Sequence, residues 1–401
     1  MVVKSKMAPV LMPMSSPDLT HMEGEAVRKV LQTRHLSIGP RLDEFEERFA
    51  DYVGTPHAVA VSSGTAGLHL CVLAAGVGPG DFVITTPFSF VASANPILYE
   101  RAVPIFVDID RETFNIDPSQ VEDAAEAIAS GGRAREAWLP RSLQGRSRGE
   151  LKAILPVHVF GESAEMGAIC EVAKRLALPV IEDACEAVGA SHDGRMVGTF
   201  GDAAVFAFYP NKQMTTGEGG MIVTGRSDWS ELFKSLRNQG RDVFDAWLTH
   251  DRLGYNYRLD EMSAALGLVQ LDRIESLLAR RERAAGWYNE RLADVEGLQV
   301  LREMPSGSRR SWFVYVVSLA PEINRDAVME ALSERRVPSR PYFTPIHLQP
   351  YFRDRFGFSE GQFPVAENAA NSTLALPFFS TMGEELVDHV CGHVAAVLKD
   401  Y

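Results

Sequence analysis

Seven short apolar runs punctuate the first 225 or so residues of the chain. Most are apolar at nearly every position rather than at every second one, which is typical of strands that helices cover on both faces of a sheet. The pattern predicts an α/β fold with a seven-stranded, mostly parallel sheet, whose strands span 58–63, 82–87, 103–109, 153–161, 179–184, 203–209 and 219–225. In such folds the ligand site lies at the carboxyl ends of the strands.

Helical stretches lie between these runs, for example at 64–76 and 163–177. Before them, "GPRLDEFEERFADYVG" has a helical start at Pro40 and a helical end at Gly54. Its apolar positions share one helical face: Leu42, Phe45, Phe49 and Tyr52. A further predicted helix, 90–101, contains Pro96, which can distort it.

One polar stretch interrupts the alternation. Residues 130–152 are rich in glycine and arginine and lie between two predicted strands. We expect a surface insertion, most simply a solvated loop, although its five arginines could also touch an anionic substrate.

The pattern changes beyond the seventh run. Residues 258–292 show one long helical period, and short strands and helices follow at 312–319, 325–336 and 383–401. We therefore predict two domains: a large α/β domain, 1–250, that begins with a helical arm, and a smaller C-terminal α+β domain, 251–401.

Composition narrows the class of protein. The chain has 401 residues, 46% of them hydrophobic, and a formal net charge of −13, which argues against nucleic acid or an anionic membrane as partner. Four widely spaced cysteines without a CxxC pair argue against a zinc site or a disulfide framework, so we expect no metal and a cytoplasmic location. The sequence contains no apolar run long enough to cross a membrane, and its first residues make a poor signal peptide.

A single lysine marks the candidate chemistry. Lys212 is the only cation in "FAFYPNKQMTTGEGG", 206–220, and follows an apolar predicted strand. Taken alone it reads as a surface charge on a turn. The glycines after it allow close approach of a ligand, but they would equally serve a plain turn into the next strand.

Three other strand ends carry suitable groups. Glu182 and Asp183 close a strand, where a carboxylate can pair with a protonated ring nitrogen or simply cap a helix. Ser62 to Thr65 stand between a strand and a helix start, which suits a phosphate or a simple cap. Phe88 and Phe90 follow another strand; a ring there can stack on a flat cofactor, and we assign Phe88 to the core.

The order of these groups is more specific than any one of them. An anion site, an aromatic ring, an acid-ended strand and an isolated lysine are what pyridoxal 5′-phosphate requires. A lysine in such a site is desolvated and nucleophilic. No Gly-rich fingerprint follows the first strand, which argues against a nicotinamide dehydrogenase on a doubly wound sheet.

The chain also resembles a known family. Stretches such as "HAVAVSSGTAGLHL", "TTPFSFVASANPILY", "PVIEDACEAVGA", "FAFYPNKQMTTGEGGMIVT" and "LGYNYRLDEMSAALGLVQL" look like the DegT/StrS-type sugar aminotransferases, a branch of the fold-type I pyridoxal-phosphate enzymes. The resemblance spans roughly 37–382 in family order. It implies a homodimer with a shared active site, and covalent attachment of the cofactor as an aldimine.

The resemblance assigns roles residue by residue. Lys212 matches the Schiff-base lysine and Asp183 the partner of the pyridine nitrogen. The remaining cofactor contacts would come from Ser63, Gly64, Thr65, Phe90 and Glu186, and from Asn256 reaching the phosphate of a neighbouring subunit. Substrate contacts are expected from His347, Arg258 and His158, although either histidine can equally be a satisfied core or turn residue.

Two positions depart from the family pattern. Ala207 stands where relatives often have a phosphate-binding serine, so one phosphate contact is lost or supplied elsewhere. Glu186 stands where relatives often have glutamine or histidine near the ring hydroxyl, and an ionised carboxylate there accepts but cannot donate a hydrogen bond.

The expected reaction is the transfer of an amino group from an amino acid, with L-glutamate the expected donor, to a nucleoside-diphosphate keto sugar. Lys212 argues against the sugar dehydratases of the family, which have histidine there. Two alternatives stay open: a same-fold enzyme for another ketone, as in aminocyclitol or aromatic amine synthesis, and a non-catalytic cofactor-binding regulatory protein.

Overall fold

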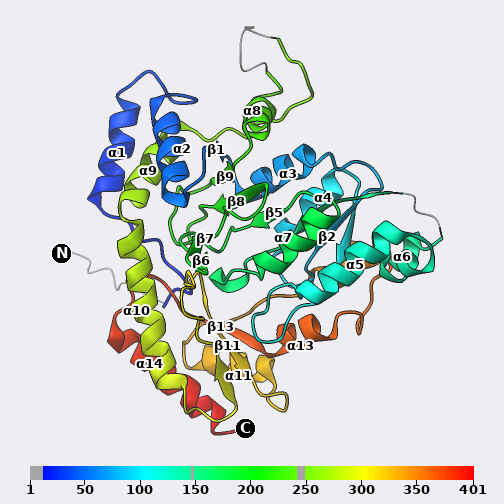
Figure 1. Ribbon diagram of the computed structural model, residues 1–401. Coiled ribbons are helices and arrows are strands. Elements are labelled where there is room, and N and C mark those ends of the chain that lie inside the picture. Colours follow the sequence, from blue (N-terminus) through cyan, green and yellow to red (C-terminus); the bar gives the residue numbers. More distant parts are fainter. Residues whose placement is uncertain (1–11, 146–148, 242–248) are drawn as a thin grey trace.

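The structure is a computed structural model that describes residues 12–145, 149–241 and 249–401 (Figure 1). The described part leaves out residues 1–11, 146–148 and 242–248. Residues 146–148 belong to the predicted insertion, and 242–248 lie near the end of the predicted large domain. Among the described residues, no helix combines the length and the apolarity needed to cross a bilayer.

The predicted strands of the large domain are all present, in two sheets. The first sheet has the order β1 (His57–Val61), β9 (Gly220–Thr224), β8 (Ala203–Ala207), β5 (Ile181–Asp183), and the second has the order β3 (Val103–Phe106), β2 (Phe82–Thr85), β4 (Leu151–Leu155). Two isolated parallel bridges, Ile154 with Val180 and Val157 with Asp183, join β4 to β5 across the seam. The pairs β2–β3, β2–β4 and β5–β8 are parallel, whereas β9 runs antiparallel to both neighbours.

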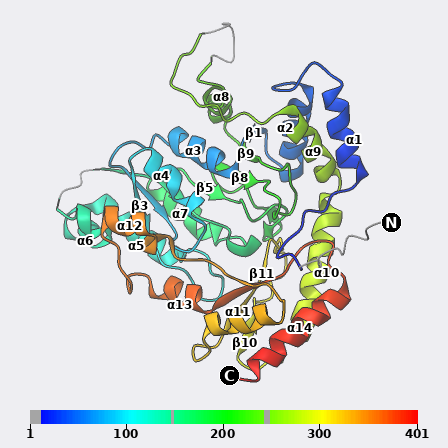
Figure 2. The same cartoon turned by 180° about the vertical axis from the view of Figure 1, so that it is seen from behind.

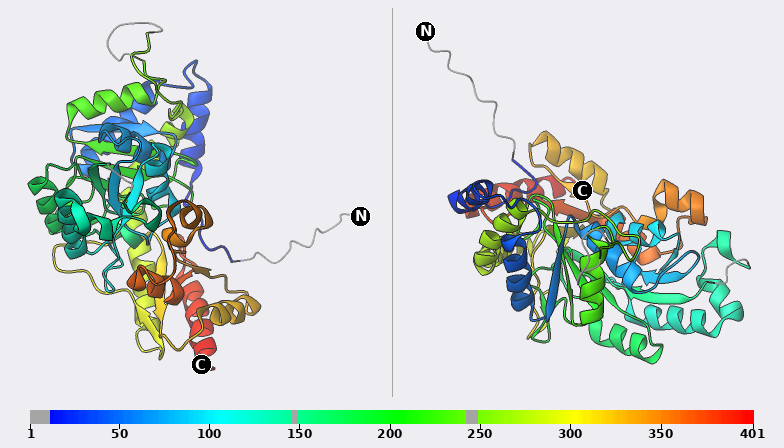
Figure 3. Two further views of the ribbon diagram at one scale, coloured as in Figure 1. Left: turned by 90° about the vertical axis from the view of Figure 1, so that its right-hand side faces the viewer. Right: turned by 90° about the horizontal axis from the view of Figure 1, so that it is seen from above.

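Helices cover both faces of these strands, as the apolar runs predicted. Along β1, Val59 and Val61 face the layer of α3 and α8, while Ala58 and Ala60 face α2 and α9. Figure 3 shows β1 between α2 and α8 when the molecule is seen from above. The helices of this part are α1 (His21–Leu31), α2 (Pro40–Val53), α3 (Gly64–Ala74), α4 (Asn95–Tyr99), α5 (Pro118–Ser130), α6 (Gly132–Trp138), α7 (Met166–Arg175), α8 (Ser227–Leu236) and α9 (Glu261–Asp272).

Two stretches differ from their predicted form. Residues 132–138 and 141–143 of the insertion are helical rather than an open loop, because Leu139 is buried and Trp138 and Leu143 pack against the core around β2 and β3. The predicted helix 90–101 is broken at Ala94 into a 3₁₀ turn, η1 (Val91–Ser93), and α4; Pro96 lies in the first turn of α4, where its missing N–H costs nothing.

The C-terminal part has its own sheet. It is antiparallel, in the order β10 (Leu298–Val300), β11 (Tyr315–Leu319), β13 (Thr373–Leu376), β12 (Arg340–Pro341). Its helices are α10 (Ile274–Leu292), α11 (Arg325–Glu334), α12 (Pro350–Phe356), α13 (Pro364–Ser372) and α14 (Glu384–Leu398). Seen from behind, α10 and α14 lie side by side at the edge of the molecule (Figure 2). The boundary at 250/251 stays a prediction.

The long helix predicted over 258–292 is two helices. It breaks at Arg273, which ends α9 and precedes α10 with φ −103° and ψ 0°. The Arg273 guanidinium bonds to Asp18 and Glu23 of the N-terminal arm, and α1 packs on α9. The ion pairs of Arg273 therefore hold the predicted N-terminal arm against the rest of the fold.

Candidate active site

The start of α3 is built to receive an anion. Ser63 is its N-cap, and the Ser63 side chain accepts a hydrogen bond from the Ala66 N–H at 3.1 Å. Gly64 and Thr65 take the first two helical positions, where backbone N–H groups have no acceptor within the helix. Free N–H groups and the helix dipole together suit a phosphate.

Gly64 also brings this helix start against two strand ends. A Cβ atom at Gly64 would lie 2.8 Å from Cys185 Sγ and 2.9 Å from Ala207 Cβ, so only glycine fits. Cys185 follows β5 and Ala207 ends β8. The methyl group of Ala207 therefore borders the candidate phosphate site.

Asp183 ends β5 and is 4% exposed. Its carboxylate accepts the Ser93 hydroxyl at 2.6 Å and the Cys185 N–H at 3.1 Å. Since Ser93 gives its proton to Asp183, the 2.7 Å contact between Ser89 and Ser93 must have Ser89 as donor. Through Ser93, the η1 turn and the 63% exposed ring of Phe90 before it are tied to Asp183.

Lys212 lies in the turn after β8, with its side chain 14% exposed. Its Nζ is 3.8 Å from Glu186 Oε1 and 3.9 Å from the centre of the Phe313 ring. An amine held between a carboxyl group and an aromatic face has few alternative positions. Sequence reasoning placed Lys212 at this edge of the sheet, and the structure puts it beside Glu186.

Glu186 is buried at 6% exposure, and its Oε2 accepts the Phe160 N–H at 3.2 Å. Burial raises the pKa of Glu186 to about 7, against the opposing effects of Lys212 and of the Phe160 N–H. The side chain is therefore partly protonated near neutral pH and can donate a hydrogen bond, which an ionised carboxylate cannot.

Asn256 is exposed on a loop near the start of α3, where the Ser62 N–H bonds the Tyr257 carbonyl at 2.8 Å. On either side of it, Tyr255 and Tyr257 stack with ring centres 5.0 Å apart. Both rings lie against His69, whose Nδ1 is 3.1 Å from the Tyr257 hydroxyl. Arg258, the other predicted residue of this loop, donates to Asn238 Oδ1 at 3.0 Å and so braces the loop. The contact of Asn256 with a neighbouring subunit stays a prediction.

The side chains of the two predicted histidines bond to Glu182 and Glu367 rather than to Lys212 or Glu186, although the His158 N–H donates to the Asp183 carbonyl at 3.0 Å. His158 is fully buried; its Nδ1 accepts the Ala164 N–H at 3.0 Å and its Nε2 lies 3.1 Å from Glu182. His347 is fully buried against Phe363 and bonds Glu367 at 3.1 Å. Burial lowers the pKa of His347, despite the opposing effect of Glu367. Their part in substrate binding is untested.

Sequence reasoning missed several residues of the site. Ser93 lies within "TTPFSFVASANPILY". Nothing in that stretch indicates that its hydroxyl bonds Asp183, which is ninety residues further along the chain. Phe313 comes from the segment before β11, and only the packing of the two sheets brings its ring to Lys212. Gln213, beside Lys212, bonds the Glu186 carbonyl at 2.6 Å and the Ser311 hydroxyl at 2.9 Å.

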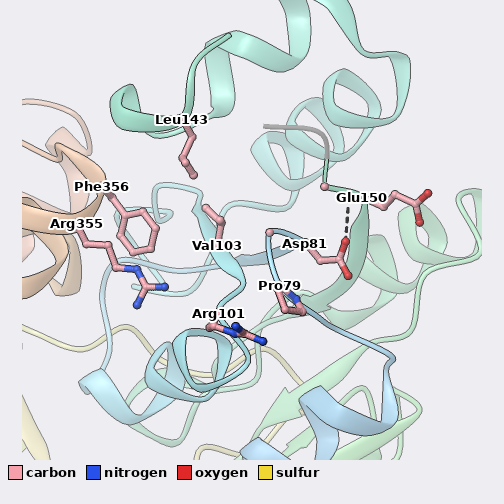
Figure 4. A pocket seen from close by; sticks show the side chains of 10 residues that line it. Pro79, Asp81, Arg101, Val103, Leu143, Glu150, Arg355 and Phe356 are labelled. Carbon is pink, nitrogen blue, oxygen red and sulfur yellow. Dashed lines mark hydrogen bonds between the residues drawn. The ribbon is translucent and has the colours of Figure 1, made fainter. Parts of the chain in front are cut away.

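A separate pocket of roughly 670 Å³ lies at the opposite edge of the sheet. Asp81, Arg101 and Glu150 stand just before β2, β3 and β4, at the amino ends of these strands (Figure 4). The two arginines that line this pocket, Arg101 and Arg355, are exposed. The buried acids and the lysine described above lie at the other, carboxyl edge, where α/β sheets bind their ligands.

The fold and the residues at this edge define a pyridoxal-phosphate-dependent aminotransferase of fold type I. The sequence profile of the DegT/DnrJ/EryC1/StrS aminotransferase family matches residues 17–395, and the chain belongs to that family of pyridoxal-phosphate-dependent sugar aminotransferases. Pyridoxal phosphate is its cofactor.

Curated relatives match nearly end to end. The chain is 37% identical to GDP-perosamine synthase of Caulobacter vibrioides, with 96% of this chain and 97% of that protein covered. It is 35% identical to the spore coat polysaccharide biosynthesis protein SpsC of Bacillus subtilis, with 97% of each covered. Among solved structures, DesV of S. venezuelae, in complex with a ketimine intermediate, is 31% identical, with 94% of each chain covered and a TM-score of 0.82.

Proposed function

We propose that this aminotransferase moves the amino group of L-glutamate to the ketone of a nucleoside-diphosphate keto sugar, releasing 2-oxoglutarate and an amino sugar nucleotide. The observation that carries the proposal is the meeting of Lys212, Asp183 and the start of α3 at one edge of the sheet. The similarity to a GDP-perosamine synthase and to a polysaccharide biosynthesis protein supports a sugar nucleotide as substrate.

The described residues fit the cofactor. Gly64 and Thr65 offer backbone N–H groups to its phosphate, and the exposed Phe90 ring offers a stacking surface. Asp183 has two donors on a carboxylate that can accept about four hydrogen bonds, so it retains lone pairs for a pyridine N–H. When bound, pyridoxal phosphate supplies an aldehyde carbon and an electron-accepting ring.

Each residue then has one task. Asp183 keeps a proton on the ring nitrogen. Lys212 would bind the aldehyde carbon of the cofactor, and its free Nζ would take the proton from the substrate carbon and return it, as general base and acid. Glu186, next to Lys212, can share or donate a proton within the same enclosed site.

The proposal includes a homodimer in which Asn256 of each subunit completes the phosphate site of the other. The stacking of Tyr255 and Tyr257 on His69 supports it, because residues that alternate along an extended loop point to opposite sides, and Asn256 is the exposed one. Arg258, His347 and His158 are proposed to contact the substrate, and a cytoplasmic location is proposed from the sparse cysteines.

The first test asks whether Lys212 carries the cofactor. Borohydride reduction of the purified protein should fix the mass of the cofactor on the peptide that contains Lys212. A Lys212→Ala variant should show neither this adduct nor turnover, whereas a variant of an exposed lysine on α8, Lys234→Ala, should keep both. Turnover retained by Lys212→Ala would overturn the assignment.

The second test separates the proposed substrate from its alternatives. A panel of nucleoside-diphosphate keto sugars, other ketones and amino donors should show glutamate-dependent amination of the sugars alone. Amination of a cyclitol or another ketone in preference to every sugar would support the same-fold alternative. A protein whose bound cofactor never responds to an amino donor would support the regulatory one.

A further inference from the structure

Arg281 is the largest fully buried side chain of the described residues, at 2% exposure in the middle of α10. Within the described part of the chain, its hydrogen bonds go to main-chain carbonyl groups, and its Nε–H has no partner. Burial lowers the pKa of Arg281 to about 10, partly opposed by the charge of Asp18. The guanidinium therefore stays charged at neutral pH, in a place where a charge is costly.

The three acceptors come from two segments that meet at the active site. One amino group of Arg281 donates to the Lys212 carbonyl at 2.9 Å. The other donates to the carbonyls of Phe313 at 3.1 Å and of Trp312 at 3.3 Å. The planar, fixed fork of the guanidinium suits such a bridge, because one rigid group sets the distance between all three carbonyls.

The same two segments hold the Lys212 amine. The Phe313 ring lies 3.9 Å from Lys212 Nζ. Arg281 thus binds the main chain of Lys212 and the main chain of Phe313, whose ring lies against the Lys212 amine. Gln213, the residue after Lys212, adds a second link between these segments, because it bonds the Glu186 carbonyl and the Ser311 hydroxyl.

We propose that Arg281 is a positioning residue of the cofactor site: it sets the Lys212 turn against Phe313 so that the lysine amine points at the aldehyde carbon. It acts through Lys212 and does not touch the cofactor or the substrate. The inference rests on the proposed role of Lys212 as the residue that bonds the cofactor.

The test compares two forms of the cofactor that differ at one carbon, which is the carbon that bonds Lys212. Pyridoxal phosphate bonds to the lysine, whereas pyridoxamine phosphate carries an amine and cannot. In Arg281→Met, which keeps the bulk and loses the donors, affinity for pyridoxal phosphate should fall about tenfold or more, because the bond to Lys212 forms only when the lysine amine is placed at the aldehyde carbon. Affinity for pyridoxamine phosphate should stay within about twofold, because its contacts are elsewhere.

Arg280 offers a matched control on the same helix. Its guanidinium is 33% exposed and pairs with Asp18 at 2.8 Å, away from Lys212. Arg280→Met should leave both affinities within about twofold, since partly exposed ion pairs contribute little. Borohydride trapping gives a second readout: the cofactor should appear on the Lys212 peptide more slowly in Arg281→Met and at the wild-type rate in Arg280→Met.

Two outcomes would overturn the inference. Equal loss of both affinities in Arg281→Met would mean that the residue supports the fold generally, and loss of neither would mean that Lys212 needs no such support. If Arg281→Met does not fold, Arg281→Lys retains the charge but not the fork, and the same selective loss, smaller in size, is expected. Absence of the Lys212 adduct from the wild-type protein would instead overturn the proposed function.

Discussion

Glu182 and Asp183 are neighbours at the end of β5, and their surroundings are opposite in kind. Both carboxylates are buried, at 0% and 4% exposure. The Glu182 side chain turns to the loop at 198–201, where it accepts the N–H groups of Gly198, Phe200 and Gly201 and lies 3.1 Å from His158 Nε2. The Asp183 side chain turns to the candidate active site, where Ser93 and Cys185 donate to it.

The difference lies in how many acceptor positions are already filled. A carboxylate can accept about four hydrogen bonds. Glu182 has four donors around it and is complete within the protein, so its role is to close the fold at the end of β4 and β5. Asp183 has two, so acceptor positions remain on this buried carboxylate for a further donor. A protonated ring nitrogen would be such a donor.

The largest effect is expected from Asp183→Asn. An amide keeps the shape and loses the charge that holds a proton on the ring nitrogen, so glutamate-dependent turnover should fall by about a thousandfold or more, of the order of 4 kcal/mol in barrier. The melting temperature should change little. Turnover within about tenfold of wild type would remove the basis for the contrast with Glu182.

The mirror experiment is Glu182→Gln. The amide NH₂ group would face backbone N–H groups that now share a carboxylate, and we expect a loss of about 3 kcal/mol in the free energy of unfolding. Turnover per folded molecule should remain within about threefold of wild type, because Glu182 lies on the far side of the strand. Denaturant unfolding and active-site titration together measure the two quantities. A stable but inactive Glu182→Gln protein would show that the two acids are not separate in function.

The contrast marks what sequence can predict. The apolar runs place both acids at a strand end, and strand ends gather at the ligand edge of a sheet, so the positions of Lys212 and Asp183 follow from local pattern. The pattern does not tell which acid faces the site. That depends on which neighbours satisfy each carboxylate, and most of these donors come from other segments: the loop at 198–201 for Glu182 and the turn at Ser93 for Asp183.

Other features escaped prediction for the same reason. The break between α9 and α10 is accompanied by the ion pairs of Arg273 with the N-terminal arm, which no helical period reveals. Arg281 reads in sequence as one of several arginines on an amphipathic helix. Its burial follows from the packing of α10 between the Lys212 turn and the segment before β11.

Glu186 provides a pH-dependent test next to Asp183. Its pKa is raised from 4.5 to about 7 in the folded, cofactor-free protein, so between these values the folded state binds more protons than the unfolded one. The free energy of unfolding should therefore fall as the pH rises from 5 to 8, with a contribution of about 2–3 kcal/mol from this group. Glu186→Gln should remove that contribution. Denaturant unfolding of both proteins at several pH values measures it, and parallel curves would contradict the assignment.

The smallest expected effect concerns how Asp183 is held. Ser93→Ala removes one of the two hydrogen bonds to this carboxylate and should reduce turnover about tenfold, consistent with about 1.5 kcal/mol for a hydrogen bond to a charged group. Ser89→Ala is the matched control, because Ser89 donates to Ser93 and not to Asp183, and should cost about twofold. The binding of pyridoxamine phosphate reports the same contact without turnover. If the two serine variants behave alike, Asp183 is oriented by the strand alone, and the difference between the two acids is then set by backbone geometry rather than by their donors.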